Sequence, residues 1–134
     1  MTNLQRKSVE EEIKNYKAYK LEYEQIKQDI LYGASRSNDE NVGGGKSNLP
    51  TNPIEDRVIA MTISNKLQRI NKIIRAVEMV YMGLDNEKQE FMRMFFWDRK
   101  YTIDGVASEL YISKRTAYYW KSEIVNLVAT HLGY

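Results

Sequence analysis

The 134-residue sequence contains no cysteine, only two prolines and a single histidine. Without cysteine the chain can form no disulfide framework, no cysteine-type zinc finger and no thiol nucleophile. With His131 as its one histidine, it can assemble neither a multi-histidine metal site nor a serine–histidine–aspartate triad. The acidic residues show no isolated pair in apolar surroundings that would suggest general acid–base catalysis. We therefore expect neither enzymatic activity nor a cofactor nor a metal site.

Long apolar runs are also missing. No stretch approaches the roughly 18 apolar residues of a membrane span, and residues 1–12 are too polar to form the core of a signal peptide. These absences predict an intracellular protein without membrane association. The formal net charge is only +2, so a nucleic-acid partner would have to be indicated by a local concentration of basic residues.

Scarce proline together with 28% charged and 43% hydrophobic residues is typical of an all-α protein. Residues 1–32 are predicted to form one long amphipathic helix that ends at Gly33. Its opposite face carries six basic and six acidic residues, which is typical of a solvated surface. The apolar residues that recur at steps of three and four are Val9, Ile13, Tyr16, Tyr19, Tyr23, Ile26 and Ile30.

Residues 33–53 are rich in glycine, asparagine and serine and contain both prolines, so they are predicted to form a flexible linker. The segment Gly43-Gly44-Gly45-Lys46-Ser47 lacks the spacing of a phosphate-binding loop, and no strand pattern precedes it.

Residues 54–83 are predicted to form a central helix with a heptad seam. The broad apolar stripe must be buried, either against the first helix in a hairpin or against a second copy in a homodimer, and the sequence leaves both open. The residues of the seam are Ile63, Leu67, Ile70, Ile74, Val77, Tyr81 and Leu84.

Residues 84–134 are predicted to form a helix-turn-helix domain. Thr102 can cap a short helix, Tyr111 and Ile112 form a short turn, and Ser113 can cap a second helix that reaches about His131. Tyr111 occupies a turn position where glycine is frequent. The residues expected on the buried side of the second helix are Ala117, Trp120, Ile124, Leu127 and Val128.

The opposite side of this second helix carries a concentration of positive charge, although the net charge of the whole chain is small. Residues 110–122 include three basic residues and no acidic one. Arg115 can donate two hydrogen bonds to guanine, and tyrosines can contact thymine methyl groups or phosphates. We expect the major groove to be entered by Ser113, Lys114, Arg115, Tyr118 and Tyr119, with Ser122 on the same exposed face. We expect the phosphate backbone to be held by Lys100, Thr102, Thr116 and Lys121. A helical interaction protein without a DNA role is the competing interpretation.

The block from Asp85 to Ile124 resembles region four of bacterial sigma factors. The residues that carry this resemblance are Thr102, Val106-Ala107, Leu110, Ile112-Ser113 and Lys114-Arg115. Over nearly its whole length, including the linker core Asn41-Val42-Gly43-Gly44, the chain resembles the RinA/ArpU group of phage and prophage transcriptional regulators of Gram-positive bacteria.

This resemblance implies a sequence-specific activator that binds promoter or operator DNA in the cytoplasm of the bacterial host. Its targets would be late genes for packaging and morphogenesis, and host RNA polymerase would be a further candidate partner. One helix of this kind covers few base pairs, so we expect two copies or a polymerase contact to be needed. The alternative is a phage small terminase subunit, which also joins a DNA-binding helix-turn-helix to an oligomerising helical region.

Overall fold

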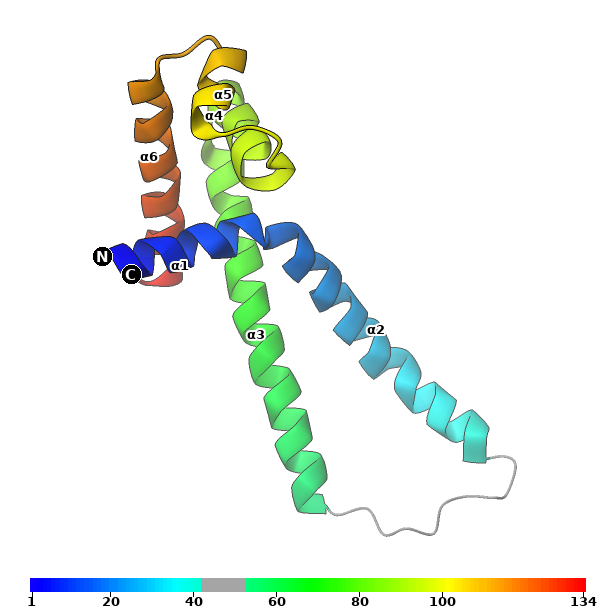
Figure 1. Ribbon diagram of the computed structural model, residues 1–134. Helices are drawn as coiled ribbons and strands as arrows, with labels where there is room; N and C mark the ends of the chain where they lie inside the picture. The colour runs from blue at the N-terminus through cyan, green and yellow to red at the C-terminus, as the bar shows by residue number, and fades with distance from the viewer. Residues whose placement is uncertain (42–52) are drawn as a thin grey trace. The chain divides into compact units, whose positions relative to one another are not determined.

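The computed structural model describes residues 1–41 and 53–134, and every regular element in them is helical (Figure 1). The prediction of an all-α protein is confirmed. The described chain divides into two compact units, one formed by residues 1–19 and 72–134 and the other by residues 20–71. Residues 42–52, which make up most of the predicted linker, lie outside the described residues. The elements are α1 (Asn3–Lys14), α2 (Tyr16–Asn41), α3 (Pro53–Gly83), α4 (Asn86–Met92), the π-helix η1 (Arg93–Asp98), α5 (Ile103–Glu109) and α6 (Lys114–Leu132).

The predicted first helix is divided in two at Asn15, which has φ −89° and ψ 6°. Asparagine has a low helix propensity because its side chain competes for backbone hydrogen bonds, so a bend costs little at this position. The start of α1 is fixed by a reciprocal cap. The Gln5 backbone N–H donates to Thr2 Oγ1 (3.1 Å), and the Thr2 N–H donates to Gln5 Oε1 (2.8 Å).

The predicted helix end at Gly33 is also wrong, because α2 continues through this glycine to Asn41. Glycine inside a helix costs about 1 kcal/mol relative to alanine, which weakens a helix without ending it. The predicted linker therefore begins too early in the chain.

The unit of residues 20–71 contains most of α2 and the N-terminal part of α3. Lys66 Nζ lies 2.7 Å from Glu22 Oε1 within this unit. Ile70 is buried and Leu67 half-buried, in agreement with the predicted seam. Its exposed large apolar side chains are Leu21, Ile30, Leu31, Ile54, Val58, Ile59 and Met61.

The other unit holds most of the hydrophobic core. In Figure 1, α1 lies across the C-terminal part of α6, and the two helices are in contact. Every core side chain described as buried is apolar, so burial of hydrocarbon and aromatic surface is the main stabilising term here. The largest fully buried side chains of this unit are Phe91, Phe96, Ile13, Met92, Ile124, Val9, Val77, Val106 and Val128.

The helix that precedes α5 begins as an α-helix and ends as a π-helix. Asp85 caps α4 by accepting a hydrogen bond from the Lys88 N–H (2.9 Å). The residue that follows η1, Arg99, adopts the left-handed conformation with φ 55°. The Trp97 indole N–H donates to the Ile13 carbonyl oxygen (3.0 Å), so η1 is tied directly to α1.

Candidate nucleic-acid interface

Helix α5 begins at a well-formed cap and presents a small buried face to α6. The Gly105 N–H donates to Thr102 Oγ1 at 3.2 Å, as expected for an N-cap threonine. Val106 and Ala107 are buried, and Ala117 of α6 is fully buried in the same core. The small alanine side chains allow the two helices to approach closely.

The turn between α5 and α6 spans residues 110–113 and is closed by backbone hydrogen bonds. Tyr111 N–H donates to the Ser108 carbonyl oxygen (3.3 Å) and Ile112 N–H donates to that of Ala107 (3.0 Å). This pair of bonds is the Schellman motif, whose C′ residue takes the left-handed conformation. Tyr111 does so with φ 56°. The glycine usually found here is therefore replaced by a tyrosine that adopts the glycine-like conformation.

Ser113 is the N-cap of helix α6, and its hydroxyl is engaged in the cap. The Thr116 N–H donates to Ser113 Oγ at 3.1 Å, and Ser113 Oγ lies 2.8 Å from Thr116 Oγ1. Thr116 is half-buried, rather than exposed as predicted. The remaining unpaired N–H groups of this first turn point out of the helix end, where an anion can accept from them.

The buried side of α6 is slightly rotated from the prediction. Ala117, Ile124 and Val128 are buried as expected, but Leu127 is 40% exposed and Trp120 only half-buried. Val125 and Ala129 complete the buried face instead. Both residues belong to the same core cluster as Val9 and Ile13 of α1, and α1 and α6 are in contact.

The exposed face of α6 carries Arg115, Tyr119 and Ser122 at steps of four and three. Tyr119 is 70% and Tyr118 53% exposed. Asn126 continues this face one turn further and lies, like Tyr119, beside a shallow hollow of about 250 Å³. Sequence reasoning ended at Ser122 and missed Asn126, although the next step of four pointed to it.

Lys121 does not belong to this exposed face, and the prediction that it is exposed is wrong. Its side chain is 29% exposed, and Nζ lies 3.2 Å from Glu10 Oε1. The same ammonium group lies 5.6 Å from the centroid of the Phe95 ring. Position 121 falls at the middle of the buried stripe, so the aliphatic part of the side chain is covered and the charge is paired with α1.

The other predicted cations remain accessible. Lys100 is exposed, as is the capping residue Thr102. Lys114 has a side chain 73% exposed, and its Nζ lies 3.7 Å from Asp104 Oδ2, which is itself half in solvent. Ion pairs this exposed contribute little free energy, so Lys114 can exchange its partner for a phosphate at low cost.

A further ion pair anchors α6 to α4. Lys88 Nζ donates to Glu123 Oε1 (3.2 Å), and this hydrogen bond raises the pKa of Lys88 above its ordinary value of 10.5. The pair holds the flank of α6 beside the exposed face.

Comparison with known proteins assigns the chain to a family. The family model described as "Protein of unknown function (DUF722)" matches residues 6–130. The chain belongs to the DUF722 family. It is also 24% identical over 127 residues to the transcriptional activator RinA of Staphylococcus phage phi11, covering 95% of this chain and 89% of that protein. The predicted resemblance to RinA-type phage regulators is thereby confirmed. No solved structure matches the chain.

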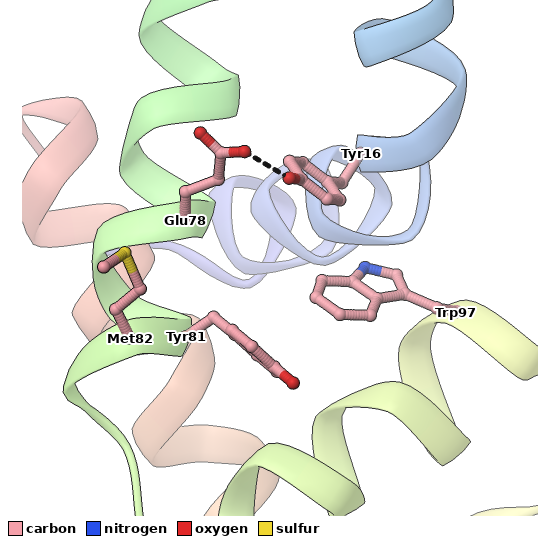
Figure 2. Close-up of a pocket in the computed structure, with 5 residues that line it drawn as sticks. All are labelled: Tyr16, Glu78, Tyr81, Met82 and Trp97. Carbon is pink, nitrogen blue, oxygen red and sulfur yellow. Dashed lines mark hydrogen bonds between the residues drawn. The ribbon is translucent and has the colours of Figure 1, made fainter.

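This DUF722 protein has a second hollow, of about 410 Å³, lined by Tyr16, Glu78, Tyr81, Met82 and Trp97 (Figure 2). The Tyr16 hydroxyl donates to Glu78 Oε2 at 2.5 Å. The ring centroids of Tyr16 and Tyr81 lie 5.2 Å and 5.4 Å from that of Trp97. The rings connect the start of α2, the end of α3 and η1, so we interpret the hollow as part of the packing that positions the core.

Two other kinds of feature, membrane-spanning helices and metal sites, can be checked in the described residues. None of the helices in the described ranges is long and apolar enough to span a membrane. Within those ranges, no group of three or more histidine or acidic side chains is arranged to hold a metal ion.

Proposed function

We propose that this chain is a phage transcriptional activator that binds double-stranded DNA through the exposed face at the N-terminal half of α6. The observation that supports this most is an exposed set of side chains at the start of a helix that follows a tight turn: Lys114, Arg115, Tyr118 and Tyr119. A helix presented in this way can enter the major groove. The similarity to a protein named transcriptional activator supports the proposal.

The exposed side chains divide by chemistry. The Arg115 guanidinium can read guanine, and the exposed tyrosines can contact thymine methyl groups. We assign Lys114 to the groove edge, and Lys100 and Thr102 to the phosphate backbone. Ser113 and Thr116 act through the capped helix start, whose free N–H groups can donate to a phosphate. Lys121 is left out because its ammonium group is paired with Glu10 of α1.

We further propose that two copies act together through the unit of residues 20–71. This unit exposes apolar side chains, including Val58, Ile59 and Met61 of α3, which are 56–65% exposed. Burying them against a second copy would remove apolar surface from water and place two reading helices on one DNA site. Sedimentation analysis should show a dimer in the full chain and a monomer for Met61→Lys with Val58→Lys. A monomeric wild-type chain would contradict this arrangement.

The genes activated would be late genes of the phage, transcribed in the cytoplasm of the bacterial host. The protein would contact the host RNA polymerase there. Only the name of the relative and the resemblance of the chain support this part of the proposal. In vitro transcription from late promoters should rise when the protein is added. A ring-shaped assembly that binds a packaging site and activates no promoter would favour the small terminase alternative.

Footprinting on phage DNA at several salt concentrations tests the DNA-binding proposal. Arg115→Ala should cost about 1–3 kcal/mol and relax the preference at one base position. A uniform loss across all sequences would instead make Arg115 a phosphate contact. Absence of any protected site at low salt would contradict the proposal itself.

A further inference from the structure

Two non-glycine residues of the described chain adopt the left-handed conformation, Arg99 with φ 55° and Tyr111 with φ 56°. Side chains with a Cβ are disfavoured there because Cβ crowds the backbone. For Arg99, a hydrogen bond within the fold offsets part of this strain, because its Nε–H donates to the Phe96 carbonyl oxygen at 3.3 Å.

The side chain of Tyr111 makes no comparable interaction in the described residues. Its side chain is 96% exposed, and within residues 1–41 and 53–134 it has no hydrogen bond, ion pair or ring contact. The turn itself is closed by backbone groups of Tyr111 and Ile112, which glycine at position 111 would supply equally well. A costly side chain that contributes nothing to its own fold points to a role in an intermolecular contact.

The position of Tyr111 indicates the partner. It lies two residues before the cap of α6, at the start of the segment 110–122 that contains three basic residues and no acidic one. The exposed Lys114 ammonium is three residues away along the chain. A polyanion is the partner that this charge favours, and a phenol hydroxyl is a good donor to a phosphate oxygen.

We propose that the Tyr111 hydroxyl donates a hydrogen bond to a DNA phosphate beside the groove that α6 enters. This inference rests on the proposed function and adds a residue to it. The contact is to the backbone, so it contributes to affinity for every sequence and adds no base preference. It also explains why the turn carries tyrosine at a position suited to glycine.

The test uses the full chain with Tyr111→Gly and Tyr111→Phe, and a fluorescein-labelled 30-base-pair duplex of arbitrary sequence at low salt. Tyr111→Gly should raise the Tm by about 3–5 °C, because glycine adopts the left-handed conformation without crowding. Both variants should bind the duplex about fivefold more weakly, the usual effect of one lost hydrogen bond. A second duplex of different sequence should show the same loss.

Salt dependence separates this contact from a charged one. A neutral hydroxyl releases no counterion, so the slope of log K against log salt should stay that of the wild type in both Tyr111 variants. Lys114→Ala should lower the slope by about 0.9. Tyr134→Phe, which alters another exposed tyrosine, serves as the matched control and should bind normally. Arg99→Gly is the control for relief of the left-handed backbone conformation. It should change the Tm without changing the affinity for the duplex.

Wild-type affinity in Tyr111→Phe would overturn the proposal while leaving the proposed function standing. A loss confined to one duplex sequence would also overturn it, since it would show a base contact. If the wild type binds neither duplex at low salt, the proposed function and this contact fail together.

Discussion

Lys121 distinguishes a residue that supports α6 from one that binds DNA. Lys121→Ala removes the ammonium group that lies 3.2 Å from Glu10 Oε1 and 5.6 Å from the centroid of the Phe95 ring. At an effective dielectric constant of about 20, the two charges attract each other by about 5 kcal/mol. Desolvation and side-chain ordering offset most of this. With side chains only 29% and 19% exposed, we expect a net coupling of about 1 kcal/mol, the upper end for surface pairs.

Urea denaturation of Lys121→Ala, Glu10→Ala and the double variant measures this coupling. DNA affinity of Lys121→Ala should stay within about twofold of the wild type, with the same salt slope, because its charge is already paired. The matched control is Lys114→Ala, which should leave stability unchanged and lower the salt slope by about 0.9. A Lys121→Ala variant that lowers the slope as Lys114→Ala does and shows no coupling to Glu10 would contradict a supporting role for Lys121.

Three other perturbations have defined outcomes. Because the pKa of Lys88 is raised in the folded chain, its pairing with Glu123 should stabilise the fold fully below pH 10.5 and lose this effect as the pH rises through the folded pKa. A Lys88→Met, Glu123→Gln double-mutant cycle at about pH 8 and about pH 11.5 would show it, and equal couplings at the two values would contradict it. Ala117→Leu should lower the free energy of unfolding by about 1–3 kcal/mol in urea denaturation, since the site is fully buried. An unchanged midpoint would mean that the packing between α5 and α6 can accommodate the larger side chain. Trp97→Phe should cost about 1 kcal/mol by removing the bond to the Ile13 carbonyl, and full retention of stability would argue against that bond.

The sequence predicted the element types of this fold better than their ends. Apolar periodicity locates the helices because it reports which face is buried. It says little about Asn15, where local propensity and the packing of α1 decide whether the helix bends. At Gly33 the sequence predicted a helix end that the structure does not have, since one glycine weakens a helix without ending it. The π-helix η1 leaves no distinct pattern in a short, densely apolar segment.

The exposed residues of the interface were predicted well where helix geometry alone decides exposure, as for Arg115 and Tyr119. Lys121 was misplaced because its burial depends on α1, more than 100 residues earlier in the chain. Periodicity within α6 could not reveal that neighbour. The left-handed backbone of Tyr111 was signalled only by the usual glycine at this position, and its isolation in solvent became visible in the structure.

Mapping of backbone amide shifts on addition of duplex DNA is the sharpest test of the proposal that α6 binds DNA. At 15.8 kDa the chain is small enough for residue-by-residue NMR assignment. The largest shifts should occur in the turn and the first half of α6, from Tyr111 to Ser122, and the residues packed around Trp97 should be unaffected. Shifts centred on Trp97, or no shifts at low salt, would contradict the assignment of this face to DNA.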